Sequence, residues 1–270
     1  MTPDAAIRFV KAEANGNDFL VVDADAAPVG ARPNLARALC DRHLGVGADG
    51  VEFVQPIADG FELHLFNANG SEAEISGNGT RCVAAFYAKH GFRQGTLITR
   101  AGPRAARIVD GAANFWTIAL DMGVPQMEGE FCLSVQHQHI AVTSLSMGNP
   151  QCVALVPVFP ENWEALGAAL ESHPHFPQHT NVEFVRVLGR HRLDIRIFER
   201  GVGPTHSSGT GSCAAAVVAI ASGHADSPVE VLTPGGSQLV HWHGPAPDAG
   251  VSLVGPARIL AEGVFFNRTL

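Results

Sequence analysis

Two stretches of the sequence share one pattern, a serine followed by Gly-x-Gly and then by small and apolar residues. The first reads SGNG from Ser76, and the second reads SGTG from Ser208. Glycines at the start of a helix let free backbone N–H groups approach a ligand, and the helix dipole favours negative charge there. Each stretch could therefore hold a carboxylate, with a serine hydroxyl beside it.

Two such helix starts acting on one ligand would suit proton transfer at the carbon next to a carboxylate. One group removes a proton from one face and the other supplies a proton to the opposite face, while the helix ends stabilise the enolate charge. The alternative is that Ser76 and Ser208 are ordinary helix caps, the usual role of serine at this position. The pairing of the two stretches, with polar neighbours, favours the catalytic interpretation but leaves the alternative open.

Those polar neighbours are asparagines in predicted turns, together with a Glu-Arg pair at the end of a predicted strand. A single asparagine in a turn is usually structural, because it tolerates the left-handed backbone region. Arg200 is a better candidate for binding, since its guanidinium matches a carboxylate and it shortly precedes the second Gly-x-Gly. The asparagines are Asn15, Asn17, Asn67, Asn69, Asn149 and Asn181.

The predicted elements occur in the same order in both halves of the chain. In each half, strands and a helix precede a strand that ends at a phenylalanine, and a loop then leads to Ser-Gly-x-Gly and a second helix. The first of these helices is predicted from a cap at Asn34 to near Gly45. Four positions align without a gap, Phe66, Ser76, Gly77 and Gly79 with Phe198, Ser208, Gly209 and Gly211. This order indicates an internal duplication, against the alternative of one mixed domain with a chance repeat. We expect an α+β fold of two similar domains, each a mostly antiparallel sheet around one apolar helix.

Composition excludes several classes of partner. The 18 basic and 26 acidic residues give a net charge of −8, which offers no electrostatic footprint for nucleic acid or for an anionic membrane. The five cysteines are odd in number and show no CxxC spacing, so reduced thiols in a cytosolic protein fit best. No signal peptide is evident, and the longest apolar run, CAAAVVAIA from Cys213, is too short to span a bilayer.

A set of motifs resembles the diaminopimelate epimerase family, in the same order and over nearly the whole chain. The motifs are GNDF, DRHLGVGADG, FNANGSEAEISGNGTRC, MGNPQC, TNVEFV, ERGVGPTHSSGTGSCAA and TPGG. The resemblance implies two pseudo-symmetric domains with the active site between them, and a C-terminal segment that returns to the first domain. The expected domains are then residues 1–116 with 257–270, and residues 117–256.

The resemblance also implies an activity. The family interconverts LL- and meso-diaminopimelate for lysine and peptidoglycan synthesis, without pyridoxal phosphate or a metal, and often forms homodimers. We therefore expect a small-molecule amino-acid substrate, no cofactor, no metal and a possible homodimer. Motif by motif, the family's substrate-binding and carboxylate-cradling residues fall on Asn17, Asn67, Gly77, Asn78, Asn149, Asn181, Arg200, Gly209 and Thr210. Glu199 matches an acidic residue beside the chemistry.

The chain departs from the family pattern at its reactive positions. The family has a catalytic cysteine at the head of each Gly-x-Gly, where this chain has Ser76 and Ser208; the family's GNPH histidine is Gln151, and an acidic residue is replaced by Pro204. A serine hydroxyl is a far weaker acid than a thiol, so an alkoxide base is hard to generate without a partner. Cys82 and Cys213 lie inside the predicted helices and do not replace the missing thiols.

Three interpretations follow from these departures. The protein is a natural epimerase that works with a serine pair, an engineered Cys→Ser form, or a homologue that binds an amino acid without turnover. Gln151 and Pro204 favour a natural lineage, because an inactive trap would need changes at the cysteines alone. A PhzF-like isomerase shares the two-domain plan and is a further alternative. We favour an epimerase whose catalytic residues are Ser76, Ser208 and Glu199.

Overall fold

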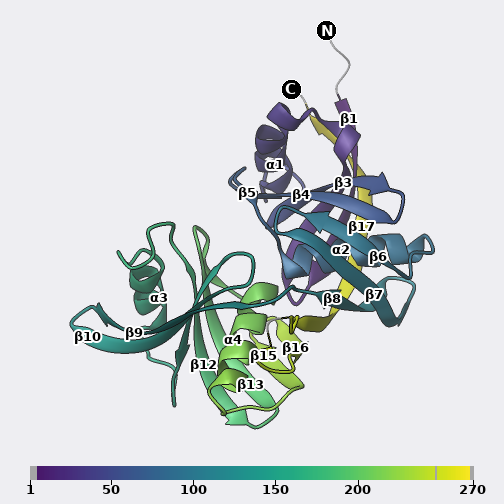
Figure 1. Cartoon of the computed structure of the whole chain (residues 1–270). Coiled ribbons are helices and arrows are strands. Elements are labelled where there is room, and N and C mark those ends of the chain that lie inside the picture. The colour runs from purple at the N-terminus through teal and green to yellow at the C-terminus, as the bar shows by residue number, and fades with distance from the viewer. Residues whose placement is uncertain (1–4, 247, 268–270) are drawn as a thin grey trace. The chain divides into compact units, whose positions relative to one another are not determined.

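The computed structural model describes residues 5–246 and 248–267 and shows two compact units (Figure 1). Within the described residues, the first unit is built from residues 5–120 and 255–267, and the second from residues 121–246 and 248–254. The domains expected from the sequence were residues 1–116 with 257–270 and residues 117–256; their terminal residues 1–4 and 268–270, and residue 247, lie outside the described part.

The first unit is a sheet curled around one helix. Among its described residues, eight strands pair in a closed ring in the order β8, β17, β1, β2, β3, β4, β6 and β7, and β7 pairs again with β8. The elements are β1 (Ala5–Ala14), β2 (Asn17–Asp23), α1 (Arg32–Cys40), β3 (Gly50–Ile57), β4 (Gly60–Asn67), β5 (Glu72–Ala73), α2 (Gly77–Lys89), β6 (Gln94–Thr99), β7 (Gly102–Ala112), β8 (Phe115–Asp121) and β17 (Ser252–Asn267). Two short 3-10 turns, η1 (Ala24–Ala26) and η2 (Val29–Ala31), precede α1. The C-terminal strand β17, yellow in Figure 1, pairs antiparallel with β1.

The second unit repeats this plan. Its elements are β9 (Gln126–Val135), β10 (Gln138–Ser146), β11 (Pro150–Leu155), α3 (Trp163–Glu171), β12 (Asn181–Gly189), β13 (Arg192–Glu199), β14 (Gly203–Thr205), α4 (Gly209–Ala221), β15 (Val229–Thr233), β16 (Gly236–His241) and the start of β17. The parallel pairs β11–β12 and β13–β15 correspond to β2–β3 and β4–β6 of the first unit, and the intervening pairs are antiparallel in both. The predicted α+β fold of two similar, mostly antiparallel halves is confirmed.

The strand registers make the duplication specific to single residues. Phe66 of β4 lies opposite Val51 of β3, and Phe198 of β13 lies opposite Val182 of β12. On the other edge, Phe66 faces Glu72, and Phe198 faces Pro204. The ungapped alignment predicted around the two phenylalanines therefore describes equivalent places in the two sheets.

One helix is the centre of each unit. All residues of α4 from Gly209 to Ala219 are buried, and α2 buries ten of its thirteen residues. The alanines of α4 combine high helix propensity with small side chains, so strands can approach the helix closely. In Figure 1, α4 lies against β12 and β13, which it contacts together with β10, β11, β15 and β16.

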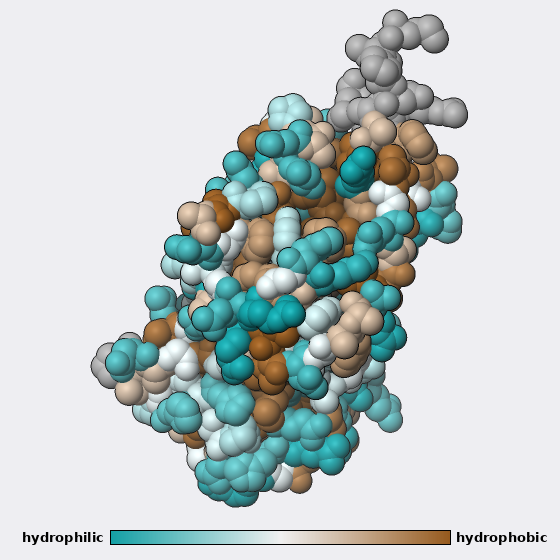
Figure 2. Space-filling view, turned by 90° about the vertical axis from the view of Figure 1, so that its right-hand side faces the viewer, coloured by the Kyte–Doolittle hydropathy of each residue, from teal (hydrophilic) through white to brown (hydrophobic). Residues whose placement is uncertain are grey.

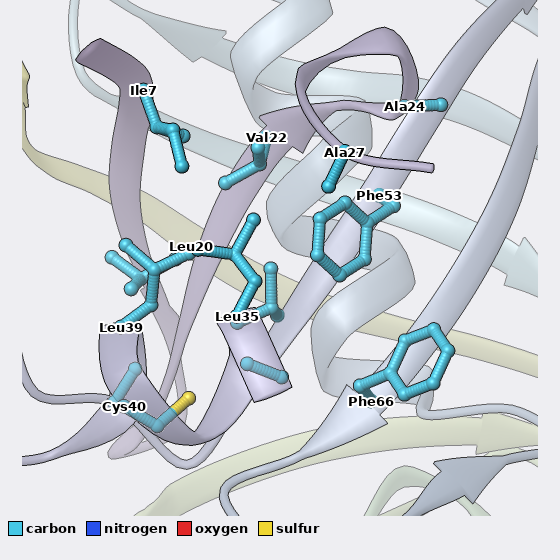
Figure 3. Packing of buried hydrophobic residues seen from close by; sticks show 13 residues of the cluster. Ile7, Leu20, Val22, Ala24, Ala27, Leu35, Leu39, Cys40, Phe53 and Phe66 are labelled. Carbon is cyan, nitrogen blue, oxygen red and sulfur yellow. The ribbon is translucent and has the colours of Figure 1, made fainter. Parts of the chain in front are cut away.

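The helix α1 covers the outer face of the first sheet. Leu35 and Leu39, four residues apart on one face of α1, pack with Leu20 of β2 and Phe53 of β3 (Figure 3). The helix was predicted to continue to near Gly45, but it ends at Cys40. The carboxylate of Asp41 accepts the backbone N–H groups of His43 and Leu44, which turns the chain away from the helix axis.

The surface is mixed in polarity. On the face drawn in Figure 2, hydrophilic residues are interspersed with hydrophobic ones. Among the described residues, no helix is both long enough and apolar enough to cross a membrane.

Candidate active site

Both candidate serines cap the helix that follows them. Ser76 has an extended backbone, and its Oγ accepts the N–H of Gly79 at 3.1 Å. Ser208 has nearly the same backbone angles, and its Oγ accepts the N–H of Gly211 at 3.2 Å. The two hydroxyls thus lie at the positive ends of α2 and α4, where the remaining first-turn N–H groups and the dipole favour an anion. Capping accounts for each serine alone, and it is compatible with a further role in both.

In the first unit, two predicted binding residues meet at the helix start. Asn78 donates from Nδ2 to Oδ1 of Asn17 at 3.2 Å, and Asn17 donates from Nδ2 to Oδ2 of Asp49 at 2.6 Å. Asp49 is itself held by Arg42, whose Nη2 donates to Asp49 Oδ1 at 2.7 Å and to Asp18 at 2.9 Å. These bonds determine the orientation of the side-chain amides of Asn17 and Asn78. Neither Asp49 nor Arg42 was predicted as part of the site.

Asn67 lies close to this group along the sheet but has its own partner. It ends β4 opposite Gly50, and the next backbone N–H, of Ala68, donates to the carbonyl of Asp49 at 3.0 Å. Its Nδ2 donates to Ser71 Oγ at 3.0 Å. The structure thus places Asn67 beside the segment that orients Asn17, with its amide turned to the following loop.

A buried arginine supports the first helix start. Arg81 of α2 is fully buried, and its Nη2 donates to Oδ1 of Asn78 at 2.7 Å and to Oδ1 of Asn15 at 3.1 Å. Its Nε donates to the carbonyl of Pro256 in β17 at 3.3 Å. A buried guanidinium that is held by several oxygens fixes the geometry of the groups around it. Arg81 was not predicted as part of the site, although a basic residue inside an otherwise apolar helix was a usable signal.

In the second unit, Asn149 contacts the second residue of its helix, as Asn17 does in the first, but it is the donor where Asn17 is the acceptor. Asn149 donates from Nδ2 to Thr210 Oγ1 at 3.4 Å, and that hydroxyl lies 3.4 Å from Ser208 Oγ. Gln151 is fully buried and donates from Nε2 to Asn149 Oδ1 at 2.6 Å. Gln151 therefore orients Asn149.

The remaining predicted residues of the second unit cluster at the end of β13. Asn181 accepts the backbone N–H of Arg200 on Oδ1 at 3.0 Å and donates from Nδ2 to the carbonyl of Pro150 at 2.9 Å. Glu199 ends β13 opposite Gly203 of β14, and both Glu199 and Arg200 are partly exposed. Asn181 thus joins the Asn149 segment to the Glu199–Arg200 corner.

Two buried glutamates lie behind the two helix starts. Glu52 of β3 is 1% exposed and Glu183 of β12 is 0% exposed. A Cβ on Gly79 would overlap Glu52 Oε1, and a Cβ on Gly211 would lie 2.6 Å from Glu183 Oε1. Burial raises the pKa of Glu52 to about 8; burial, and then the charge of Glu199, raise the pKa of Glu183 as well.

This glutamate pair was not predicted, although the same four-residue motif contains both glutamates. Residues 51–54 and residues 182–185 both read VEFV, with a glutamate in the middle of an apolar strand. The repeat places the same acid at the same depth in both sheets.

The buried cysteines Cys82 and Cys213 do not lie at the helix heads. Cys82 and Cys213 are fully buried within α2 and α4, away from the first residue of either helix. Burial is the main cause that raises the pKa of Cys82, so its thiol is not a ready base. The heteroatoms at the helix heads are the hydroxyl oxygens of Ser76 and Ser208.

Comparison with known proteins gives the family. The family model described as "Diaminopimelate epimerase" matches residues 9–128 and 143–260. A diaminopimelate epimerase of Synechocystis sp. is 38% identical over 281 residues, covering 96% of this chain and 98% of that protein. One of Aromatoleum aromaticum is 39% identical over 278 residues, with 96% and 98% covered.

Among solved structures, a phenazine biosynthesis protein of the PhzF family from Bacillus anthracis is similar, with a TM-score of 0.74 at 17% identity. The match covers 96% of this chain and 98% of that one, and it shows a common fold. The family model and the two relatives match this chain in sequence, whereas the solved structure matches it in fold alone. These sequence matches show that the chain belongs to the diaminopimelate epimerase family.

Proposed function

We propose that this protein is an amino-acid epimerase that needs no cofactor and interconverts LL- and meso-diaminopimelate. The observation that carries the proposal is the duplicated helix start, in which each unit presents a hydroxyl oxygen and an oriented amide or hydroxyl at the positive end of a buried helix. Family membership supports the substrate, because the curated relatives carry that name.

The reaction needs one base and one acid, on opposite faces of the α-carbon. In the proposed step, Ser76 or Ser208 acts as an alkoxide and takes the α-hydrogen as a proton, and the C–H electron pair passes into the α-carbon and its carboxylate. The other serine then gives its hydroxyl proton to the opposite face of that carbon. The enzyme ends with the two serines exchanged in protonation state, so atoms and charges balance and no oxidant takes part.

The polar groups around the serines have separate roles in the proposal. The first N–H groups of α2 and α4, at Gly77, Asn78, Gly209 and Thr210, cradle the carboxylate on which enolate charge develops. The Arg200 guanidinium and the amides of Asn17, Asn67, Asn149 and Asn181 bind the substrate's other polar groups. Glu199 is the acidic group proposed to assist proton transfer.

The serine hydroxyls favour a second candidate, a homologue that binds the amino acid and turns it over slowly or not at all. A thiol has a reference pKa of about 8.5, whereas a serine hydroxyl ionises only at much higher pH. The oriented amides would serve binding equally well in that case. The two candidates therefore differ in turnover and agree on the ligand.

Hydrogen exchange separates the two candidates. LL-diaminopimelate incubated with the protein in deuterated water should gain α-deuterium and yield the meso isomer, and both signals should vanish in Ser76→Ala and in Ser208→Ala. Ser222→Ala, at the opposite end of α4, is the matched control and should leave exchange unchanged. Tight calorimetric binding without exchange at high protein concentration would support the binding protein instead.

Restoring thiols tests whether the site is built for epimerisation. In the Ser76→Cys, Ser208→Cys double variant, we expect exchange faster by orders of magnitude, because each thiol ionises far more readily at the helix N-terminus. A double variant that binds the ligand and remains as slow as the unmodified protein would contradict the two-base proposal.

Family resemblance further supports a cytosolic location and a homodimer. It also supports a small amino acid as the substrate. Sedimentation of the purified protein at micromolar concentration should give twice the mass of one chain. A monomer over the whole concentration range would contradict this part of the proposal.

A further inference from the structure

Glu52 and Glu183 occupy equivalent places in the two sheets. Glu52 lies between Val21 of β2 and Leu65 of β4 in the strand register, and Glu183 lies between Val153 of β11 and Ile197 of β13. An acidic side chain at the centre of an apolar sheet is unfavourable without compensation. Its occurrence in both units, within the same VEFV word, indicates a common purpose.

Each glutamate packs on the second glycine of the adjacent Gly-x-Gly. Glu52 Oε1 takes the room that a Cβ would need on Gly79, and Glu183 Oε1 does the same at Gly211. These glycines also donate their N–H groups to the Oγ of Ser76 and of Ser208. Each carboxyl group therefore lies directly against the residue that holds a candidate catalytic serine.

The two carboxyl groups are largely unpaired. Within the described part of the chain, Glu52 Oε2 and both carboxyl oxygens of Glu183 are buried without a hydrogen-bond partner. An ionised carboxylate in such surroundings would carry a large desolvation cost, whereas a protonated carboxyl group avoids most of it.

We propose that Glu52 and Glu183 are a matched pair of positioning residues whose uncharged carboxyl groups hold Gly79 and Gly211 in place and leave the positive helix ends to the carboxylate of the ligand. This inference rests on the proposed function, because the ligand is an amino acid. An ionised carboxylate behind the helix start would compete with the ligand for the same positive potential. A neutral one supports the helix start without that competition.

The surroundings of each glutamate determine its response to pH. Around Glu52, the facing residues of β2 and β4 are apolar, and the titratable neighbour on α2 is Cys82. Around Glu183, the titratable neighbours are Cys152 on β11 and Glu199 on β13. Burial raises the pKa of both cysteines, and the charge of Glu199 contributes to raising the pKa of Glu183.

Ionisation should therefore weaken both the fold and the site as the pH rises. In the native state Glu52 keeps its proton up to a pKa of about 8, whereas in the unfolded chain it loses the proton near pH 4.5. Below pH 4.5 its contribution to stability is complete. The unfolding equilibrium constant then rises about tenfold per pH unit between those values, and it becomes independent of this group above pH 8.

Infrared spectroscopy tests the charge state without any ligand. At pH 7 the protein should show the carbonyl stretch of protonated, buried carboxyl groups, and Glu52→Gln and Glu183→Gln should each remove one component. Glu130→Gln, which changes an exposed acid of the second unit, is the matched control and should remove none. Spectra in which neither buried variant loses such a band would overturn the proposal.

Ligand affinity tests the positioning role. Calorimetry with LL-diaminopimelate should show the unmodified protein losing at least tenfold in affinity between pH 7 and pH 9. Glu52→Gln, which mimics the protonated acid, should bind as well as the unmodified protein at pH 7 and lose less affinity at pH 9. The inference would be overturned if Glu52→Gln lost as much affinity between pH 7 and pH 9 as the unmodified protein does. It would also be overturned if Glu52→Gln bound tenfold more weakly than the unmodified protein at pH 7. Neither result would contradict the proposed function. A protein that binds no diaminopimelate at any pH would instead overturn the proposed function, while the infrared bands still report the carboxyl groups.

Discussion

The start of α2 and the start of α4 share a frame and differ in what surrounds it. Both have a capping serine, a glycine that donates to that serine, and a buried glutamate behind the glycine. Five residues into the helix, the first unit has the buried charge of Arg81, whereas the equivalent residue of the second is Cys213.

The second unit orients its polar groups with neutral side chains. Gln238 of β16 donates from Nε2 to Ser207 Oγ at 2.9 Å and lies 3.4 Å from Ser212 Oγ, and Gln151 holds Asn149. The shared serine and glycines form a helix start that can accept an anion, and the neighbouring side chains determine the charge near it. A buried cation favours negative charge in the first unit, while the charge of Glu199 acts on the buried Glu183 in the second. The two helix starts thus share the serine, the glycine and the buried glutamate, and they differ in the charged groups that surround them.

The largest effect on stability should come from removing the charge that distinguishes the first unit. Arg81→Met leaves Asn15 Oδ1, Asn78 Oδ1 and the carbonyl of Pro256 without this donor in the interior, so we expect a loss of at least about 3 kcal/mol in the free energy of unfolding. Cys213→Ala should cost about 1 kcal/mol, because it removes little more than one buried apolar group. Urea denaturation measures both, and equal losses would contradict the comparison.

A smaller effect should follow from adding a methyl group to the shared glycines. Gly79→Ala and Gly211→Ala force each Cβ against a buried carboxyl group, so each should cost about 1–3 kcal/mol, although alanine normally favours a helix. Gly30→Ala and Gly189→Ala, where a Cβ meets nothing within 4 Å, are the matched controls and should be nearly neutral.

The glutamates supply the decisive test of that explanation. In a Glu52→Ala background, Gly79→Ala should cost less than it does alone, because the room beside the glycine has been vacated. A cost that is the same in both backgrounds would show that Glu52 is not what excludes a side chain at Gly79.

The smallest effect should be the loss of each cap. Ser76→Ala and Ser208→Ala each remove one hydrogen bond to a first-turn N–H, so each should lower the free energy of unfolding by about 1 kcal/mol. Thermal and urea denaturation should give similar values for the two, since the cap belongs to the shared frame. A loss several times larger at one serine would show that the two starts differ in the frame itself.

Much of the fold followed from local patterns. The order of strands and helices, the duplication around Phe66 and Phe198, and the serine at each helix head were predicted because turn residues, caps and periodicity act over a few neighbours. The end of α1 was predicted wrongly, since the Asp41 side chain ends the helix before Gly45 and its competing bonds leave little trace in composition. The placing of the predicted site residues in one active site stays a prediction.

The polar support of the helix starts could not be predicted in the same way. Arg81 and Asp49 act through partners that are distant in sequence, such as Pro256, which lies 175 residues from Arg81. The VEFV repeat was visible in the sequence, but nothing local to it shows that its glutamate would lie against a glycine of a helix that begins later in the chain.

The sequence by itself determined the duplicated plan, the chemistry available at each helix head and the family, because residue types and their spacing along the chain are sufficient for these. Only the tertiary structure decided that Glu52 and Glu183 fill the place of a side chain on Gly79 and Gly211, and that one helix start rests on a buried cation and the other on neutral amides. The reason is physical: burial removes water from these groups, and their charge and orientation are then determined by whichever distant residues the folded sheet brings into contact with them.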